Sequence, residues 1–156
     1  MKKENILSET FKKFPSVKDK NYFEGNVYLK DISKNIKQMD YKVYHVLFIK
    51  GAKTRIHSHR TSQTLLATKG KGIVVTFNKI RRIINGYLIK RDQIIYLIKG
   101  EMIIIPKDII HLHGANADNI FSHITINGIK EPNTIWYESD SKYSNDNLSY
   151  KINKLN

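Results

Sequence analysis

Apolar positions along this chain form many short runs that are separated by turn residues. From Tyr22 onward the runs are rich in Ile, Val, Tyr, Phe and Leu, and Gly, Asn, Asp or Pro lies between them. Short β-branched and aromatic runs of this kind are typical of strands, and no long helical pattern interrupts them. The pattern predicts an all-β, antiparallel sandwich or barrel. We expect strands at 27–32, 41–50, 55–57, 63–68, 72–77, 80–84, 87–90, 94–98, 102–105, 110–113, 120–127 and 134–137.

The two ends of the chain differ from this pattern. Residues 1–20 are polar and basic, and Ser8 is a suitable N-cap for a short helix over residues 9–14. We therefore expect an N-terminal arm or short helix over 1–20. A single β domain over 21–138 and a polar C-terminal tail over 139–156 complete the predicted organisation, which agrees with the length of 156 residues.

Composition narrows the possible chemistry. The chain has no cysteine, so disulfides and thiolate ligands are excluded and any metal must lie on nitrogen and oxygen atoms. No apolar run is long enough for a secretory signal or a membrane span, so we expect a cytoplasmic protein with no membrane partner. The net charge is +13, but the lysines are scattered and no nucleic-acid motif accompanies them. We therefore do not expect a nucleic-acid partner.

Five of the six histidines lie in or just after two short clusters. His57 and His59 alternate along a predicted strand, so both side chains project to one face, and Gln63 follows four residues later. His111 and His113 form the second cluster, after Pro106. A distant strand that adds a third imidazole to the first two would complete a metal site with open positions. His45 lies outside the clusters and is interpreted as a hydrogen-bonded structural residue.

The spacing of these residues resembles the two cupin motifs. Residues 51 to 70 are similar to G-x5-H-x-H-x3-E-x6-G, with Gln63 in place of the glutamate. Residues 100 to 116 are similar to G-x5-P-x-G-x2-H-x3-N, with Asp108 for the glycine and Ala115 for the asparagine. The resemblance implies the cupin double-stranded β-helix, a jelly-roll barrel, as the fold of 21–138.

Further segments resemble one group of small bacterial cupins. They are YFEGNVYLKDI at 22 to 32, the QTL that follows the first histidines, IPKDIIHLHGA at 105 to 115 and SHITI at 122 to 126. The group includes cupins found beside carboxymuconolactone decarboxylases and the manganese-dependent cupin hydroxynitrile lyases, and its members carry the same glutamine. The similarity covers roughly residues 21 to 137. One departure is an insertion of about a dozen residues near 79–93.

The resemblance implies a site and a partner state. One divalent metal would be held by His57, His59, Gln63 and His111; manganese is favoured, while iron, nickel, cobalt and zinc remain open. His123 matches the general base of the lyases. Positions of the substrate pocket fall on Tyr44, Val46, His113 and Asn127, and Tyr44 is bulkier than its counterpart in the lyases. Members of the group are usually homodimers.

The ligand set itself favours one class of reaction. Three neutral imidazoles and a neutral amide leave the metal charge uncompensated, so the ion would be a strong Lewis acid toward a small oxygen-containing compound. With His123 near neutral pKa as a base, this favours a lyase or isomerase. A cupin dioxygenase and a non-catalytic cupin that binds a small ligand or metal are the alternatives.

The insertion has two interpretations. Asn85-Gly86 is a strong type I′ turn signal, so the segment is predicted to be a hairpin. Its charge is 5 − 1 = +4, from Lys79, Arg81, Arg82, Lys90 and Arg91 against Asp92. The hairpin either extends two barrel strands and packs on the body or a dimer contact, or forms a basic arm for an anionic partner.

Overall fold

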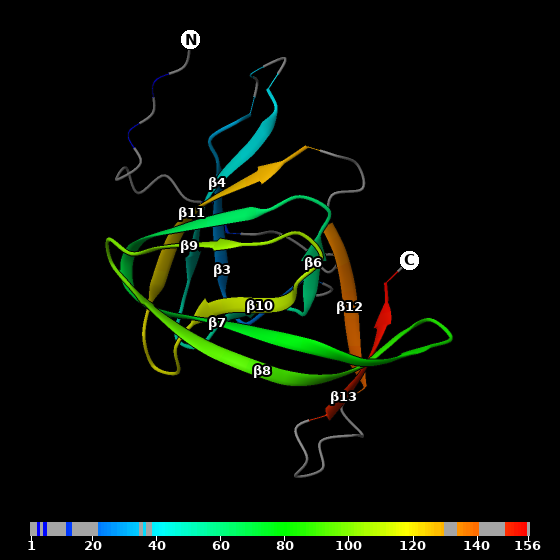
Figure 1. Cartoon of the computed structure of the whole chain (residues 1–156). Coiled ribbons are helices and arrows are strands. Elements are labelled where there is room, and N and C mark those ends of the chain that lie inside the picture. The colour runs from blue at the N-terminus through cyan, green and yellow to red at the C-terminus, as the bar shows by residue number, and fades with distance from the viewer. Residues whose placement is uncertain are drawn as a thin grey trace.

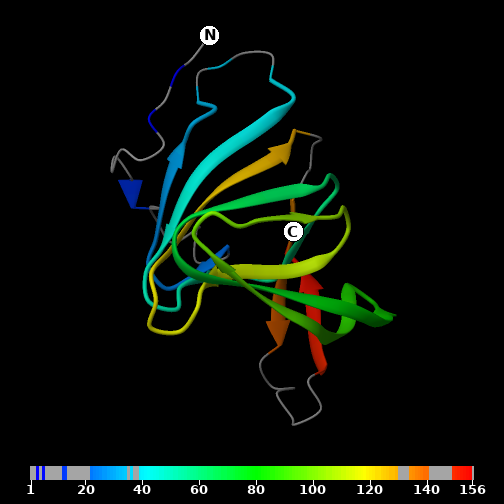
Figure 2. The same cartoon turned by 60° about the vertical axis from the view of Figure 1, so that its left-hand side comes forward.

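The strands of the chain wrap into a barrel, shown by a computed structural model in two orientations (Figures 1 and 2). The structure describes residues 3, 5, 12–13, 22–34, 36, 39–129, 134–140 and 149–155. Every regular element in these ranges is a strand, which confirms the predicted all-β, antiparallel structure. The strands are β1 (Lys12–Lys13), β2 (Phe23–Glu24), β3 (Val27–Asp31), β4 (Tyr41–Phe48), β5 (Lys53–Thr54), β6 (His57–His59), β7 (Gln63–Ile83), β8 (Gly86–Ile98), β9 (Met102–Ile105), β10 (Ile110–Ala115), β11 (Phe121–Gly128), β12 (Thr134–Asp140) and β13 (Ser149–Lys154).

Strand β7 belongs to both sheets of the barrel. Its first part pairs with β11 and β9, in a sheet that continues through β4 and β3. Its second part pairs with β8 on one side and β10 on the other. From β8 the pairing continues through β13, β12 and β6 to β10, so these six strands form a closed circuit. The change of sheet lies at Gly70, which has a φ of +73°. A Cβ there would lie 1.7 Å from the Ile120 carbonyl oxygen, so only glycine allows this crossing.

Alternate residues of the strands face two separate hydrophobic clusters. The larger cluster lies between the sheets and includes Phe48, Leu65 and Phe121. The second cluster lies inside the β7–β8–β13–β12–β6–β10 circuit and is formed by Ile56, Val75, Phe77, Ile89, Ile110, Tyr137 and Ile152. On β10, Ile110 belongs to the second cluster and Leu112 packs against it. His111 and His113 alternate with these residues along the strand, so their side chains project to the opposite face.

The predicted hairpin is present, but its turn lies one residue earlier than the sequence indicates. Ile83 pairs with Gly86, so the turn residues are Ile84 and Asn85, and neither has a positive φ. The type I′ assignment is therefore wrong. Gly86 is required for a different reason, because a Cβ at this position would lie 1.8 Å from the carbonyl oxygen of Ile152 on β13. The turn signal in the sequence thus marks a close approach of two strands.

Both chain ends contain a strand. Residues 149–154, within the polar tail, form β13 and pair with β8 on one side and β12 on the other. At the other end, Lys12 and Lys13 form β1 and pair with β3, so the short helix expected there is wrong at these two positions. The other residues of that expected helix lie outside the described ranges. A helix this short is unstable alone, whereas pairing gives the backbone groups partners. No helix in the described part of the chain has the length and apolar character to cross a bilayer.

Candidate metal centre

Three strands bring the four predicted ligands together inside the barrel. His57 and His59 lie on β6, His111 lies opposite His57 on β10, and Gln63 begins β7. The ring centroids of His57 and His111 are 4.2 Å apart, and those of His57 and His59 are 5.0 Å apart. All four side chains are buried. The antiparallel pairing of β6 with β10 therefore converts two distant sequence clusters into one group.

Hydrogen bonds hold each of the three imidazoles in a defined orientation. His57 donates from Nδ1 to the carbonyl oxygen of Arg55 at 2.8 Å, and His111 donates from Nδ1 to that of Ile109 at 2.9 Å. In His59, Nδ1 lies 3.1 Å from Oγ1 of Thr134. Because a carbonyl only accepts, Nδ1 carries the proton in His57 and His111, and Nε2 keeps its lone pair. Such outer hydrogen bonds are typical of metal-binding histidines.

Gln63 is oriented by its neighbour on β11. Its Nε2 donates to Oδ1 of Asn127 at 3.0 Å, and its Oε1 lies 3.1 Å from Nε2 of His111. The amide oxygen thus points toward the histidines, which is the orientation a metal ligand requires. Asn127, predicted to line the substrate pocket, is placed behind Gln63 as the group that positions its amide.

The buried histidines of the barrel are suited to a divalent metal ion. Nε2 of His59 is buried and has no hydrogen-bond partner. An unsatisfied polar atom in the interior costs free energy, and a bound metal ion would remove this cost. Among the described residues, one ligand atom each from His57, His111 and His113 lie within 4.8 Å of one another, and His59 is not part of this group. The group shares His57 and His111 with the predicted ligands. His113 was predicted only as a pocket residue, although its alternation with His111 places both on one face.

Burial keeps these imidazoles neutral. It lowers the pKa of His59 to about 3, with the charge of His111 adding to the effect, and it lowers the pKa of His111 to about 4. The pKa of His57 lies well below its usual value because of burial and then of the charges of His111 and His59. Neutral imidazole is the form that binds a metal, so the site is prepared for an ion at neutral pH.

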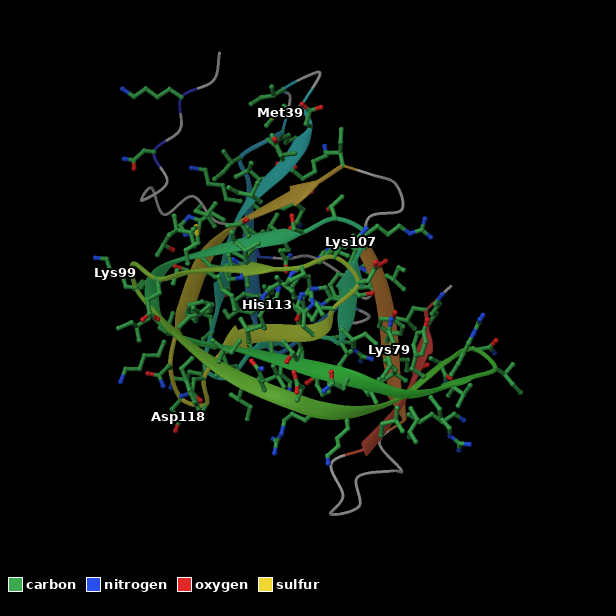
Figure 3. The ribbon with its side chains drawn as sticks, viewed as in Figure 1. Met39, Lys79, Lys99, Lys107, His113 and Asp118 are labelled. Atoms are coloured by element: carbon green, nitrogen blue, oxygen red, sulfur yellow. The ribbon has the colours of Figure 1, made fainter. Side chains whose placement is uncertain are left out.

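His123 lies behind His113 in the interior of the barrel. Nε2 of His123 is 3.2 Å from Nδ1 of His113, and Phe48 and Phe121 pack around the ring. Figure 3 shows His113 at the centre of the barrel. The sequence predicts a near-neutral pKa for His123, and this is wrong: burial, followed by the charge of His45, lowers the pKa to about 3. His123 is therefore a neutral but weak base.

The other predicted pocket residues lie on β4. Val46 is buried in the larger core cluster and pairs with His123 on the neighbouring strand β11. Tyr44 is partly buried and packs against the same cluster. Between them, His45 turns the opposite way, and its Nε2 lies 3.0 Å from Oγ1 of Thr68. The structure thus gives His45 the hydrogen-bonded structural position that the sequence indicates.

Comparison with known proteins supports the fold. No family model matches the chain, and no curated protein matches it. Among solved structures, a cupin-like protein from Thermotoga maritima has 28% sequence identity and a TM-score of 0.60, over 83% of this chain and 88% of that chain. A cupin 2 conserved barrel domain protein from Rhodopseudomonas palustris has 10% identity and a TM-score of 0.58, over 77% of this chain and 71% of that chain.

A third similarity is to part of a larger enzyme. An oxalate decarboxylase from Bacillus subtilis, a protein with Mn(II) centres, has 19% identity and a TM-score of 0.54. The match covers 72% of this chain and 28% of that one. The chain therefore has the cupin fold, with a group of buried histidines that are suited to a metal ion.

Proposed function

We propose that this chain is a metal-dependent cupin enzyme that acts on a small oxygen-containing organic compound, as a lyase or isomerase. One observation carries the proposal. His57, His59 and His111 meet inside the barrel with their Nδ1 atoms hydrogen-bonded, and the buried Nε2 of His59 has no partner. This arrangement has the form of a three-imidazole metal site.

The proposed ligands are His57, His59, Gln63 and His111. Oε1 of Gln63 and Nε2 of His111 are directed at each other, so an ion between the histidines would have the amide oxygen beside it. When bound, the ion would act as a Lewis acid toward a substrate oxygen. The resemblance to the manganese-dependent lyases favours Mn²⁺. The fold similarity to oxalate decarboxylase does not choose between manganese, iron, cobalt, nickel and zinc.

The proton acceptor in this proposal is the His113–His123 pair. One nitrogen of the pair must donate and the other accept across the 3.2 Å contact, so a proton taken up at His113 can be shared with Nε2 of His123. This sharing acts against burial, which lowers the pKa of His113 well below its usual value. His113 lies nearer the ligands, with its ring centroid 5.4 Å from that of His57 and 5.9 Å from that of His111. His123 thus acts through His113. Both side chains of the pair are buried.

A second candidate function is a non-catalytic cupin that binds metal or a small ligand. The lowered pKa of His123 and its packing between Phe48 and Phe121 favour this alternative, because a buried weak base gives little proton transfer. A cupin dioxygenase would use the same three imidazoles. Oxygen consumption with candidate substrates separates it from the lyase.

We further propose that the chain forms a homodimer through the outer face of the β9–β7–β11 sheet. Met102 pairs with Leu66, and both side chains are exposed. Ile104 and Ile126 are exposed on the strands at either side of Thr64. A contiguous apolar strip of this kind is typical of an association surface. Sedimentation at several protein concentrations tests it, and a monomer throughout would contradict it.

The experiment that tests the proposed function begins with metal analysis of the purified protein. We expect one divalent ion per chain, and stoichiometric metal in the His57→Ala, His111→Ala double variant would refute the site. A screen of cyanohydrins, hydroxy acids and lactones follows. For a substrate that is turned over, His123→Ala should keep its metal and lose most of its activity. If no compound reacts while metal stays bound, the non-catalytic alternative stands.

A further inference from the structure

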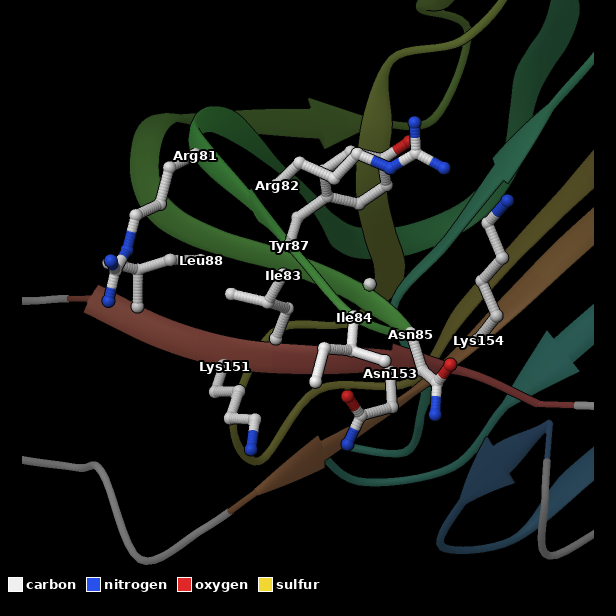
Figure 4. Close-up of a pocket in the computed structure, with 11 residues that line it drawn as sticks. Arg81, Arg82, Ile83, Ile84, Asn85, Tyr87, Leu88, Lys151, Asn153 and Lys154 are labelled. Atoms are coloured by element: carbon white, nitrogen blue, oxygen red, sulfur yellow. The ribbon is translucent and has the colours of Figure 1, made fainter.

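The tip of the β7–β8 hairpin and the facing part of β13 form a groove of about 950 Å³ on the outside of the barrel (Figure 4). Four cationic side chains line it: Arg81, Arg82, Lys151 and Lys154. None of the described residues that line the groove is acidic, and none is a histidine of the metal site. The groove therefore combines a concentration of positive charge with a location separate from the proposed chemistry.

Aliphatic side chains accompany these cations at the most projecting point. Ile84, in the turn, is 97% exposed, and Figure 4 shows it beside Asn85 at the end of the hairpin. Ile80 on the β7 arm is 51% exposed, and Ile83 lines the groove. An isoleucine this exposed at a protruding tip contributes nothing to the packing of the barrel. Exposed aliphatic side chains that gather at one tip are a feature of association surfaces.

The groove lies on strands that are packed against the barrel beneath it. Ile89 on β8 and Ile152 on β13 are fully buried in the second cluster, below the tip. The carbonyl of Ile152 lies directly over Gly86, so β13 contacts the hairpin backbone closely. The acid of the insertion, Asp92, accepts hydrogen bonds from Asn78 and Thr76 at the base of the hairpin. Asp92 is therefore engaged at the base of the hairpin, away from the cations that line the groove.

The combination of groups selects one class of partner. A groove for single-stranded nucleic acid pairs its cations with aromatic platforms, but the ring of Tyr87 is covered by Nζ of Lys79, 4.7 Å from the centroid. A peptide cannot add to β13, because β8 and β12 occupy both of its edges. An anionic lipid surface matches both features, since its phosphates attract cations and its interface accepts aliphatic side chains.

We propose that the hairpin tip and β13 dock on an anionic lipid surface, with Ile84 entering the headgroup region and the four cations facing phosphate groups. The contact is peripheral and spans nothing. It departs from the expectation of no membrane partner, which rests on the absence of a signal or spanning segment in the sequence. The inference is independent of the proposed function because it uses none of the metal-site residues.

The test is co-sedimentation of the metal-loaded protein with vesicles. One set contains phosphatidylcholine alone, and the other contains equal amounts of phosphatidylcholine and phosphatidylglycerol. We expect binding to the second set only, and weaker binding as salt rises. The Arg81→Glu, Arg82→Glu double variant should lower the partition coefficient at least about tenfold. Ile84→Ser should lower it about fivefold without changing its salt dependence.

A matched control reverses two charges elsewhere. The Lys69→Glu, Lys99→Glu variant changes the net charge equally, on exposed residues away from the groove (Lys99 is labelled in Figure 3). It should keep most of the vesicle binding. Equal losses in both double variants would show attraction by net charge alone and overturn the proposal. So would the absence of binding to anionic vesicles, or binding of single-stranded RNA, but not vesicles, that depends on Arg81 and Arg82. Melting curves establish that each variant is folded.

Discussion

Gln63 donates a hydrogen bond from Nε2 to Oδ1 of Asn127 at 3.0 Å, and this contact turns its Oε1 toward the histidines. The same Oδ1 accepts from Oγ1 of Thr125 at 3.0 Å. Because two donors converge on one oxygen, the Asn127 amide is held with Oδ1 toward Gln63. The orientation of a predicted ligand is thus set by the strand beside it.

This contact makes the Gln63→Glu variant informative. We expect the variant to keep its metal, with a weaker Lewis acid because a negative charge is added. Its carboxylate would face Oδ1 of Asn127 with no proton to donate, so the metal-free form should lose about 1–3 kcal/mol of stability. Urea unfolding and metal analysis measure both effects. Gln93→Glu, at an exposed position, is the control, and equal stability of the two variants would contradict the proposed role of Asn127.

The choice between the two histidine groupings can be decided by stoichiometry. If His59 is a ligand, His59→Ala should lose most of the bound metal, and His113→Ala should retain it with an affinity reduced no more than about 10- to 100-fold. The reverse outcome would make His113 the third imidazole. His45→Ala removes a buried histidine that contacts Thr68 and should leave the metal content unchanged. Isothermal titration with Mn²⁺ gives the affinities.

The low pKa values of the site make the stability of the metal-free protein depend on pH. The pKa values of His59 and His111 fall from 6.5 in the unfolded chain to about 3 and about 4 in the folded protein. Between the folded and unfolded pKa values, the unfolded chain binds more protons than the folded protein. The contribution of these histidines to the free energy of unfolding is therefore fully present above about pH 6.5 and is lost as the pH falls toward their folded pKa values. Each group contributes a slope of up to about 1.4 kcal/mol per pH unit.

Urea unfolding of the metal-free protein from pH 7 to pH 5 measures this slope. The His111→Ala variant should have a shallower slope, because it lacks one histidine that stays neutral in the folded protein but is protonated in the unfolded chain. A free energy of unfolding that stays constant over this range in the wild-type protein would contradict the neutral, buried state of the histidines. Bound metal should preserve stability at lower pH, since the ion competes with protons for Nε2.

Gly86 provides a test of the hairpin that is independent of the metal. A Cβ at this position would lie 1.8 Å from the carbonyl oxygen of Ile152, and the obstacle is backbone. We expect Gly86→Ala to cost about 3 kcal/mol of stability and to increase hydrogen exchange in β13. Ile84→Ala, two residues earlier and exposed, should change stability by less than about 0.5 kcal/mol. Equal stabilities would show that β13 does not rest on Gly86.

Local pattern was sufficient for much of the barrel. The expected strands at 102–105 and 110–113 correspond to β9 and β10, because each is an apolar run bounded by turn residues. The prediction that His57, His59, Gln63 and His111 lie together came from the resemblance to the cupin motifs. Periodicity alone gives only that His57 and His59 share a face, and pairing between distant strands decides which residue meets them.

Features that depend on distant contacts were not visible in the pattern. The expected separate strands at 63–68 and 72–77 are one strand, β7, because Gly70 bends the chain without ending it. β13 is mostly polar in sequence, and Ile152 is the residue that joins the second cluster among those of its side chains that the structure describes. The low pKa of His123 also depends on burial by Phe48 and Phe121, which lie far from each other along the chain.

The position of β13 between β8 and β12 has a consequence for how the protein folds. Residues of β13 pair with Gly86–Lys90, far away in sequence, and the strand circuit around Ile152 is open until this pairing forms. Such distant pairings are formed late, because the chain must first lose the entropy of a long loop. The edges of β8 and β12 are exposed during that interval. Association between incompletely folded chains should therefore begin at these two edges, as a kinetic competitor of β13.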